Sequence, residues 1–137
     1  MNERLPKFKG KKLLAEIEKS TAGLIYISET DADIEPYFGG HVQTVEVSHF
    51  TSNEHRKGKH ETLDPQDFFE RLTKEKDWFG PREKDRAGRF ASLEKLLEEN
   101  LRDLTVFKIG HIRIDIYVVG IDADGNLAGI KTRAVET

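Results

Sequence analysis

The sequence predicts an α+β fold with a largely antiparallel sheet, and three observations support that prediction. Residues 86–101 repeat apolar side chains at spacings of three and four, which is typical of an amphipathic helix. Residues 111–121 alternate apolar and polar side chains, and Asp124-Gly125 then predicts a tight hairpin into a strand that starts at Asn126. Helices and strands come in runs, not in strict βαβα alternation, which favours an antiparallel sheet covered by helices.

The rest of the chain predicts one further helix and several short strands. Residues 1–9 are expected to be loose, and residues 10–22 are expected to form a helix that ends at Gly23. Pro36 restricts its strand to a sheet edge or a bulge. Short apolar or alternating runs predict strands at residues 23–28, 34–38, 41–50 and 105–110.

The middle of the chain mixes charge with clear helix signals. Segment 51–62 is the most charged stretch, and we expect it to form an exposed loop. Asp64 then predicts the N-cap of a helix, with Pro65 at its first position. Gly80 and Pro81 are expected to break the pattern before the long helix.

Composition excludes several classes of protein. The chain has 137 residues, so we expect a single domain over residues 10–137. A net charge of −3 gives no polyanion-binding signature, and direct binding of nucleic acid is not expected. The absence of cysteine excludes disulfides and thiol catalysis. No apolar run approaches the roughly 20 residues that a membrane helix needs, and the N-terminus has no signal-peptide pattern. We therefore expect a cytoplasmic protein with no membrane contact.

One motif is close to a calcium-binding loop but departs from it. Asp122, Asp124 and Asn126 have the spacing of the first three ligands, but the template requires Gly at the sixth position and Glu at the twelfth. Leu127 and Arg133 occupy those positions. The motif is therefore interpreted as a hairpin turn.

Hydrolytic and metal-dependent chemistry have weak support. His55 and His60 could ligate a metal, but their spacing matches no zinc pattern. Ser28 and Asp31 could belong to a hydrolytic triad, but no nucleophile elbow surrounds Ser28. A small hydrolase that uses the His55 and His60 loop remains a minor alternative. Three cations in the same loop could contact phosphate but are more simply a solvated face: Arg56, Lys57 and Lys59.

Two residues have both a structural and a functional interpretation. Trp78, in DWF, is either a core plug over a helix end or an aromatic anchor at a protein interface, where tryptophan is common among binding hot spots. Glu29, in the turn-like SET that follows an apolar strand, is either a surface acid or a binding residue.

Several stretches together resemble the nuclease A inhibitor (NuiA-like) family, over most of the chain from about Leu13 to Thr137. They are GLIYISET, DPQDFFERL, DWF, the long Leu-rich helix and, most specifically, IDIYVVGIDADGNLAGIKTRAVET. The resemblance implies a three-layer α/β/α sandwich with a mostly antiparallel central sheet. It also implies no catalytic activity and no cofactor of the protein's own.

The resemblance implies a partner as well. Proteins of this family bind and block a sugar-nonspecific, Mg²⁺-dependent DNA/RNA nuclease of the ββα-metal type, and we expect a 1:1 complex with a chain that is monomeric when free. By motif match, Thr137 would ligate the partner's Mg²⁺ in the complex, with Glu136 beside it, and Glu29 would reach a basic residue of the enzyme. Trp78 is a weaker match to a partner contact.

The chain end suits that role chemically. Mg²⁺ prefers hard oxygen ligands. A C-terminal threonine offers a carboxylate and a hydroxyl on one residue, and a strand from Asn126 would hold it on a rigid stem that lowers the ordering cost of binding. The alternative function is a non-catalytic protein-binding module of the same fold with a different protein target.

Overall fold

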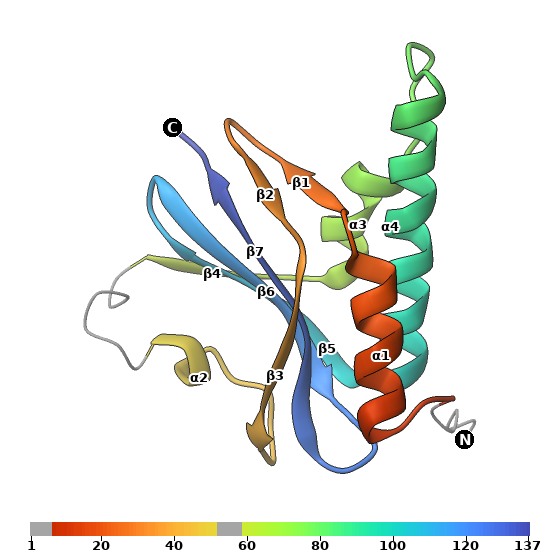
Figure 1. The fold of residues 1–137 in the computed structure, drawn as a ribbon. Helices are drawn as coiled ribbons and strands as arrows, with labels where there is room; N and C mark the ends of the chain where they lie inside the picture. Colours follow the sequence, from red (N-terminus) through yellow and green to blue (C-terminus); the bar gives the residue numbers. More distant parts are fainter. Residues whose placement is uncertain (1–6, 52–58) are drawn as a thin grey trace.

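The computed structural model describes residues 7–51 and 59–137, and it shows an antiparallel sheet with helices packed against one face (Figure 1). The α+β fold class is confirmed. The elements in chain order are α1 (Gly10–Thr21), β1 (Ile25–Ile27), β2 (Asp31–Asp33), β3 (Glu35–His41), α2 (Ser48–Thr51), β4 (His60–Leu63), α3 (Pro65–Thr73), α4 (Pro81–Asn100), β5 (Arg102–Gly110), β6 (Arg113–Ile121) and β7 (Asn126–Val135).

The main sheet has five strands in the order β3-β7-β6-β5-β4, and every neighbouring pair is antiparallel. Strand β7 lies inside the sheet and pairs with β6 in an unbroken register from Ile121 opposite Leu127 to Arg113 opposite Val135. Strands β1 and β2 form a separate hairpin that lies beside the end of β7. The last strand of the chain is therefore supported on both sides.

Two local predictions are confirmed by their hydrogen bonds. Asp64 caps α3 by accepting the backbone N–H of Gln66 at 2.8 Å, with Pro65 as the first helical residue. In the turn between β6 and β7, Asp122 Oδ1 accepts the N–H groups of Asp124 and Asn126, both at 2.9 Å. The DADGN motif is thus a hairpin turn closed by its own aspartate.

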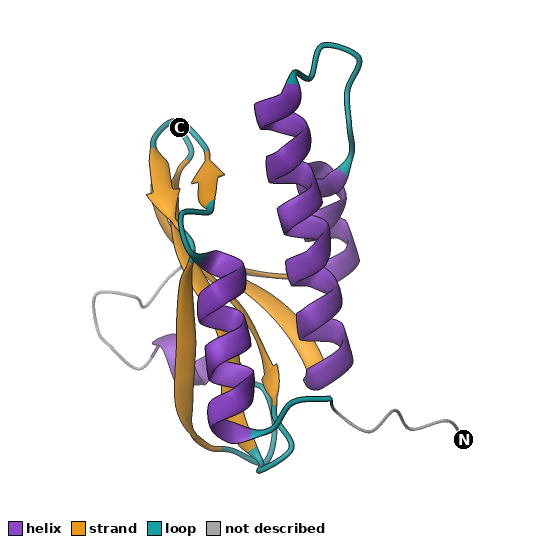
Figure 2. Ribbon diagram, turned by 45° about the vertical axis from the view of Figure 1, so that its right-hand side comes forward, coloured by secondary structure: helices purple, strands orange, loops and turns teal. Residues whose placement is uncertain are grey.

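Helices α1, α3 and α4 cover one face of the sheet, as Figures 1 and 2 both show. Their apolar side chains meet those of the strands in the larger core. The fully buried members of this core include Leu13, Ile17, Phe69, Leu93, Leu97, Val106, Ile116 and Ala128.

No helix among the described residues is long and apolar enough to cross a membrane.

A smaller core lies on the opposite face of the sheet. Phe50 of α2 packs on Tyr117 of β6 with ring centroids 4.2 Å apart, and the other buried members of this core are Phe107, Ile109, Val119 and Leu127. Within the described residues, this face carries the four-residue α2 and the segment before it. The three-layer part of the expected architecture therefore stays a prediction.

The strand expected at residues 41–50 is wrong. His41 ends β3, and the chain then crosses the sheet so that Val42, Val45 and Val47 pack against the smaller core. Val42 N–H still donates to the Gly125 carbonyl at 3.1 Å, but the later backbone hydrogen bonds are local, such as the one from Phe50 N–H to the Val47 carbonyl at 2.9 Å. The apolar residues of this segment are partly buried because it lies across the sheet, which alternation alone does not distinguish from a strand.

Two boundaries also differ from expectation. Residues 60–62 belong to β4, whose His60 is opposite Ile109 of β5, and not to an exposed loop. Helix α4 begins at Pro81, five residues earlier than expected, because the Glu83 side chain accepts the N–H of Gly80 at 3.0 Å and closes the first turn. His55, Arg56 and Lys57 lie outside the described residues.

Candidate functional site

The end of the chain is held by the turn that joins β1 to β2. The Ser28 hydroxyl donates to the Thr30 carbonyl at 2.8 Å and accepts the Val135 N–H at 3.1 Å. The Glu29 N–H donates to the Val135 carbonyl at 3.3 Å. Because β6 pairs with the other edge of β7 up to Val135, the last strand is hydrogen-bonded on both sides as far as its final residue.

Glu136 is anchored through both its backbone and its side chain. Its N–H donates to the Ile112 carbonyl at 2.9 Å, and its carboxylate accepts from Lys108 Nζ at 2.9 Å. The Lys108 side chain is only 12% exposed, whereas that of Glu136 is 43% exposed. This ion pair fixes the residue just before Thr137 against strand β5.

Thr137 is bound to Glu29 by two hydrogen bonds. The Thr137 N–H donates to Glu29 Oε2 at 2.5 Å, and the Thr137 hydroxyl donates to Glu29 Oε1 at 2.8 Å. These two bonds, the hydroxyl's first and the amide's second, hold the pKa of Glu29 below its ordinary value of 4.5, so this exposed carboxylate is ionised at neutral pH. The two residues that sequence reasoning singled out separately are thus in direct contact.

Trp78 lies in the connection between α3 and α4 and is 69% exposed. Its ring meets that of Phe79 edge-on, with centroids 4.8 Å apart. The core-plug interpretation is therefore wrong. In both Figures 1 and 2 the connection between α3 and α4 lies at the same end of the molecule as the C-terminus and the tip of the β1–β2 hairpin.

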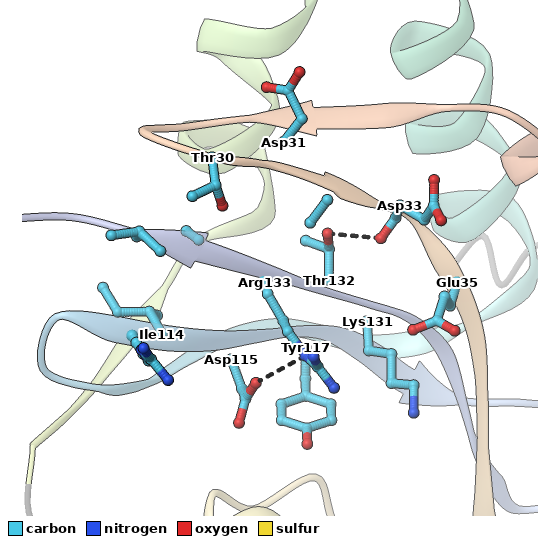
Figure 3. A pocket seen from close by; sticks show the side chains of 14 residues that line it. Thr30, Asp31, Asp33, Glu35, Ile114, Asp115, Tyr117, Lys131, Thr132 and Arg133 are labelled. Carbon is cyan, nitrogen blue, oxygen red and sulfur yellow. Dashed lines mark hydrogen bonds and ion pairs between the residues drawn. The ribbon is translucent and has the colours of Figure 1, made fainter.

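A groove of about 600 Å³ begins beside the chain end and runs along the sheet (Figure 3). Its lining mixes both signs of charge. Arg133 Nε lies 3.8 Å from Asp115 Oδ1, and the Thr132 hydroxyl donates to the Asp33 carbonyl at 2.9 Å. A groove with such balanced charge is not built to bind a polyanion. The charged lining residues are Asp31, Asp33, Glu35, Arg113, Asp115, Lys131 and Arg133.

The structure gives no support to the hydrolytic alternatives. The hydroxyl of Ser28 is used in the two hydrogen bonds that hold the Val135 backbone, which is a structural role. Among the described residues there is no group of three His, Asp or Glu side chains that could hold a metal ion.

Two residues of the site were not found by sequence reasoning. Lys108 was not identified as a candidate. A lysine between Phe107 and Ile109 in a strand lies on a largely apolar surface, so its charged group is expected to have a partner. Ser28 was considered only as a nucleophile, and its position two residues before Thr30 is the signal for a turn-closing hydroxyl.

The fold and the site define a class of protein: a small α+β protein whose chain end is anchored by hydrogen bonds, exposed and rich in oxygen atoms. The model of the family described as "Nuclease A inhibitor-like protein" matches residues 11–137, and the chain belongs to this family. Membership implies a nuclease inhibitor, that is, a protein that binds a nuclease. The search of curated proteins found no match.

Proposed function

We propose that the protein inhibits a sugar-nonspecific, Mg²⁺-dependent nuclease of the ββα-metal type by placing Thr137 at the metal of its active site. The observation that supports this most is the way Thr137 is held. It is exposed, yet Glu29 binds both its amide and its hydroxyl, and its neighbour Glu136 is fastened to Lys108 and Ile112. A binding residue that is already ordered loses less entropy when the complex forms.

The donor set at this end suits magnesium. With Thr137 as the chain terminus, its carboxylate and hydroxyl are hard oxygen donors, which is what Mg²⁺ prefers. The nuclease metal, when bound in its own enzyme, holds the phosphate of the nucleic acid. An anionic carboxylate can occupy the same position. The protein would need no cofactor of its own, because the Mg²⁺ belongs to the partner.

The remaining predicted contacts surround that point. Glu29 is charged and exposed, so it can face a basic residue of the enzyme. Trp78 is exposed in the connection between α3 and α4, and that connection lies at the same end of the molecule as the C-terminus (Figure 1). Glu136 would act beside Thr137, chiefly by keeping the last peptide in place. We propose a 1:1 complex in the cytoplasm between the nuclease and a monomeric inhibitor, with no contact of the inhibitor to nucleic acid or membrane.

Titration of such a nuclease with this protein tests the proposal. Cleavage of DNA and of RNA should fall together and reach its minimum at one inhibitor per enzyme. Calorimetry should show that affinity drops when Mg²⁺ is removed by a chelator, because the metal contact is lost. Binding without any loss of cleavage would instead favour a protein-binding module with another target.

A further inference from the structure

We propose that Glu29 is a positioning residue for Thr137: it holds the amide and the hydroxyl of Thr137 in the free protein, so that the oxygen donors of the chain end already face outward before the nuclease binds. The effect of this positioning on nuclease inhibition rests on the proposed function. Its physical basis, the contact between Glu29 and Thr137, is present in the free chain.

The direction of the hydroxyl hydrogen bond is what matters. A hydroxyl has one hydrogen and two lone pairs. In Thr137 the hydrogen is donated to Glu29 Oε1 at 2.8 Å, so the lone pairs of Oγ1 point away from Glu29. A metal ligand must present a lone pair, and a freely rotating hydroxyl would have to be ordered when the complex forms. Glu29 orders it beforehand.

The amide hydrogen bond fixes the rest of the residue. The Thr137 N–H is donated to Glu29 Oε2, and together the two bonds make a closed ring that restrains both the backbone and the side chain of Thr137. Glu29 is itself placed by its own N–H, which binds the Val135 carbonyl at 3.3 Å. The backbone of Glu29 is therefore bound to the last residue of β7, while its carboxylate holds Thr137 two residues further on.

Holding Thr137 does not prevent Glu29 from meeting a partner. A carboxylate offers about four lone-pair sites, and Thr137 uses two of them. The others belong to an exposed group and can accept from a basic residue of the enzyme. Replacement of Glu29 should then have two separable effects, one on the order of Thr137 and one on any direct ion pair.

The first test is made on the free protein by NMR. In Glu29→Gln, the order parameter of the Thr137 amide should fall from about 0.8 to below about 0.6, the range of a frayed end. The matched control Glu18→Gln makes the same change on the exposed side of α1 and should leave Thr137 unchanged. An unchanged order parameter in Glu29→Gln would overturn the proposal.

The second test is a double-mutant cycle on binding of an Mg²⁺-loaded ββα-metal nuclease. Glu29→Gln should weaken binding about tenfold in the full chain and clearly less in a chain that lacks Thr137, because the part of its effect that acts through Thr137 is then lost and only the direct ion pair remains. Equal losses in both backgrounds would mean that Glu29 acts only by a direct contact, and would overturn the proposal. Thr137→Ser, which keeps the hydroxyl, should keep the coupling.

The two hypotheses can fail separately. If the full chain neither binds nor inhibits such a nuclease, the proposed function is contradicted, and the NMR result on the free protein still decides whether Glu29 orders Thr137. If the chain inhibits strongly while Thr137 stays ordered in Glu29→Gln, the proposed function stands and the positioning role is wrong.

Discussion

Ser28 and Val135 are 107 residues apart in the sequence, and the hydroxyl of the first accepts the backbone N–H of the second at 3.1 Å. The same hydroxyl closes its own turn by donating to the Thr30 carbonyl. One side chain therefore joins the tip of the β1–β2 hairpin to the end of β7. The site at Thr137 depends on this junction, because Glu29 lies in that turn.

Ser28→Ala should loosen the junction without unfolding the protein. The Val135 N–H loses its acceptor, so we expect the free energy of unfolding to fall by about 1 kcal/mol and the Val135 amide to exchange faster with solvent. Urea unfolding and hydrogen exchange measure the two effects. Ser92→Ala, on the exposed side of α4, is the control. Unchanged exchange at Val135 would show that the hydrogen bond is not important in solution.

Trp78→Ala should separate binding from folding. The side chain is 69% exposed, so its removal should change the free energy of unfolding by less than about 0.5 kcal/mol. If Trp78 is an interface anchor, affinity for the nuclease should fall by about 2 kcal/mol. Trp78 is the only tryptophan of the chain, so its fluorescence can be followed alone. Its emission should shift to shorter wavelength when a nuclease that does not itself fluoresce in this range is added. Unchanged affinity would remove Trp78 from the interface.

Glu94 should destabilise the protein at neutral pH. Burial, and then the negative charge of Glu98 one turn away, raise the pKa of Glu94 above its ordinary value of 4.5. A raised pKa means that the folded state favours the protonated acid, so stability is lost as pH rises through that pKa. Glu94→Gln should therefore stabilise the protein at pH 7, by about 0.3 to 0.5 kcal/mol because solvent screens the pair.

The gain in Glu94→Gln should vanish at about pH 3, where both carboxyl groups are protonated. Urea unfolding at the two pH values measures the difference, and Glu18→Gln on α1 controls for the substitution itself. A gain that is equally large at both pH values would have to come from helix propensity or packing, and not from charge.

Association with the nuclease should depend on salt. Glu29 and the carboxylate of Thr137 concentrate negative charge at one end of a chain whose net charge is only −3. An active site that attracts a polyanion has a basic rim, so the association rate should fall as salt rises and screening shortens to about 8 Å near physiological ionic strength. The dissociation rate should respond less, because the proposed metal contact would be buried in the complex.

Stopped-flow or surface-binding rates over a salt series measure this dependence. A flat association rate together with a strongly salt-dependent dissociation rate would place the binding surface elsewhere on the molecule, such as the charged segment 51–62.

Part of the fold was predictable because it depends on interactions between residues that are close in the sequence. Asp64 and Pro65 specify the start of α3 through groups next to them in the chain, and the turn between β6 and β7 is closed by Asp122 within a few residues. The segment after His41 was not predictable in this way. Its valines are partly buried because they pack against Phe50 on the face of the sheet opposite the helices, and the alternation of the sequence does not distinguish this tertiary contact from a strand.

Some members of the site were predictable, but its geometry was not. Family resemblance indicated Glu29 and Thr137 as separate contacts to a partner, and nothing in their spacing of 108 residues predicts that they bind each other. Lys108 was missed for the same reason, since its partner Glu136 is reached only when β5 and the chain end lie side by side. Contacts made across a folded sheet need the sheet to be known first.

Inhibition by the protein with and without Thr137 tests the central claim most directly. Deletion of this exposed residue should leave the unfolding transition unchanged, because it is outside both cores. The inhibition constant for a sugar-nonspecific, Mg²⁺-dependent nuclease should nevertheless rise about 100-fold or more, roughly 2.7 kcal/mol of binding free energy. An inhibition constant equal to that of the full chain would contradict the claim that Thr137 occupies the metal site of the enzyme.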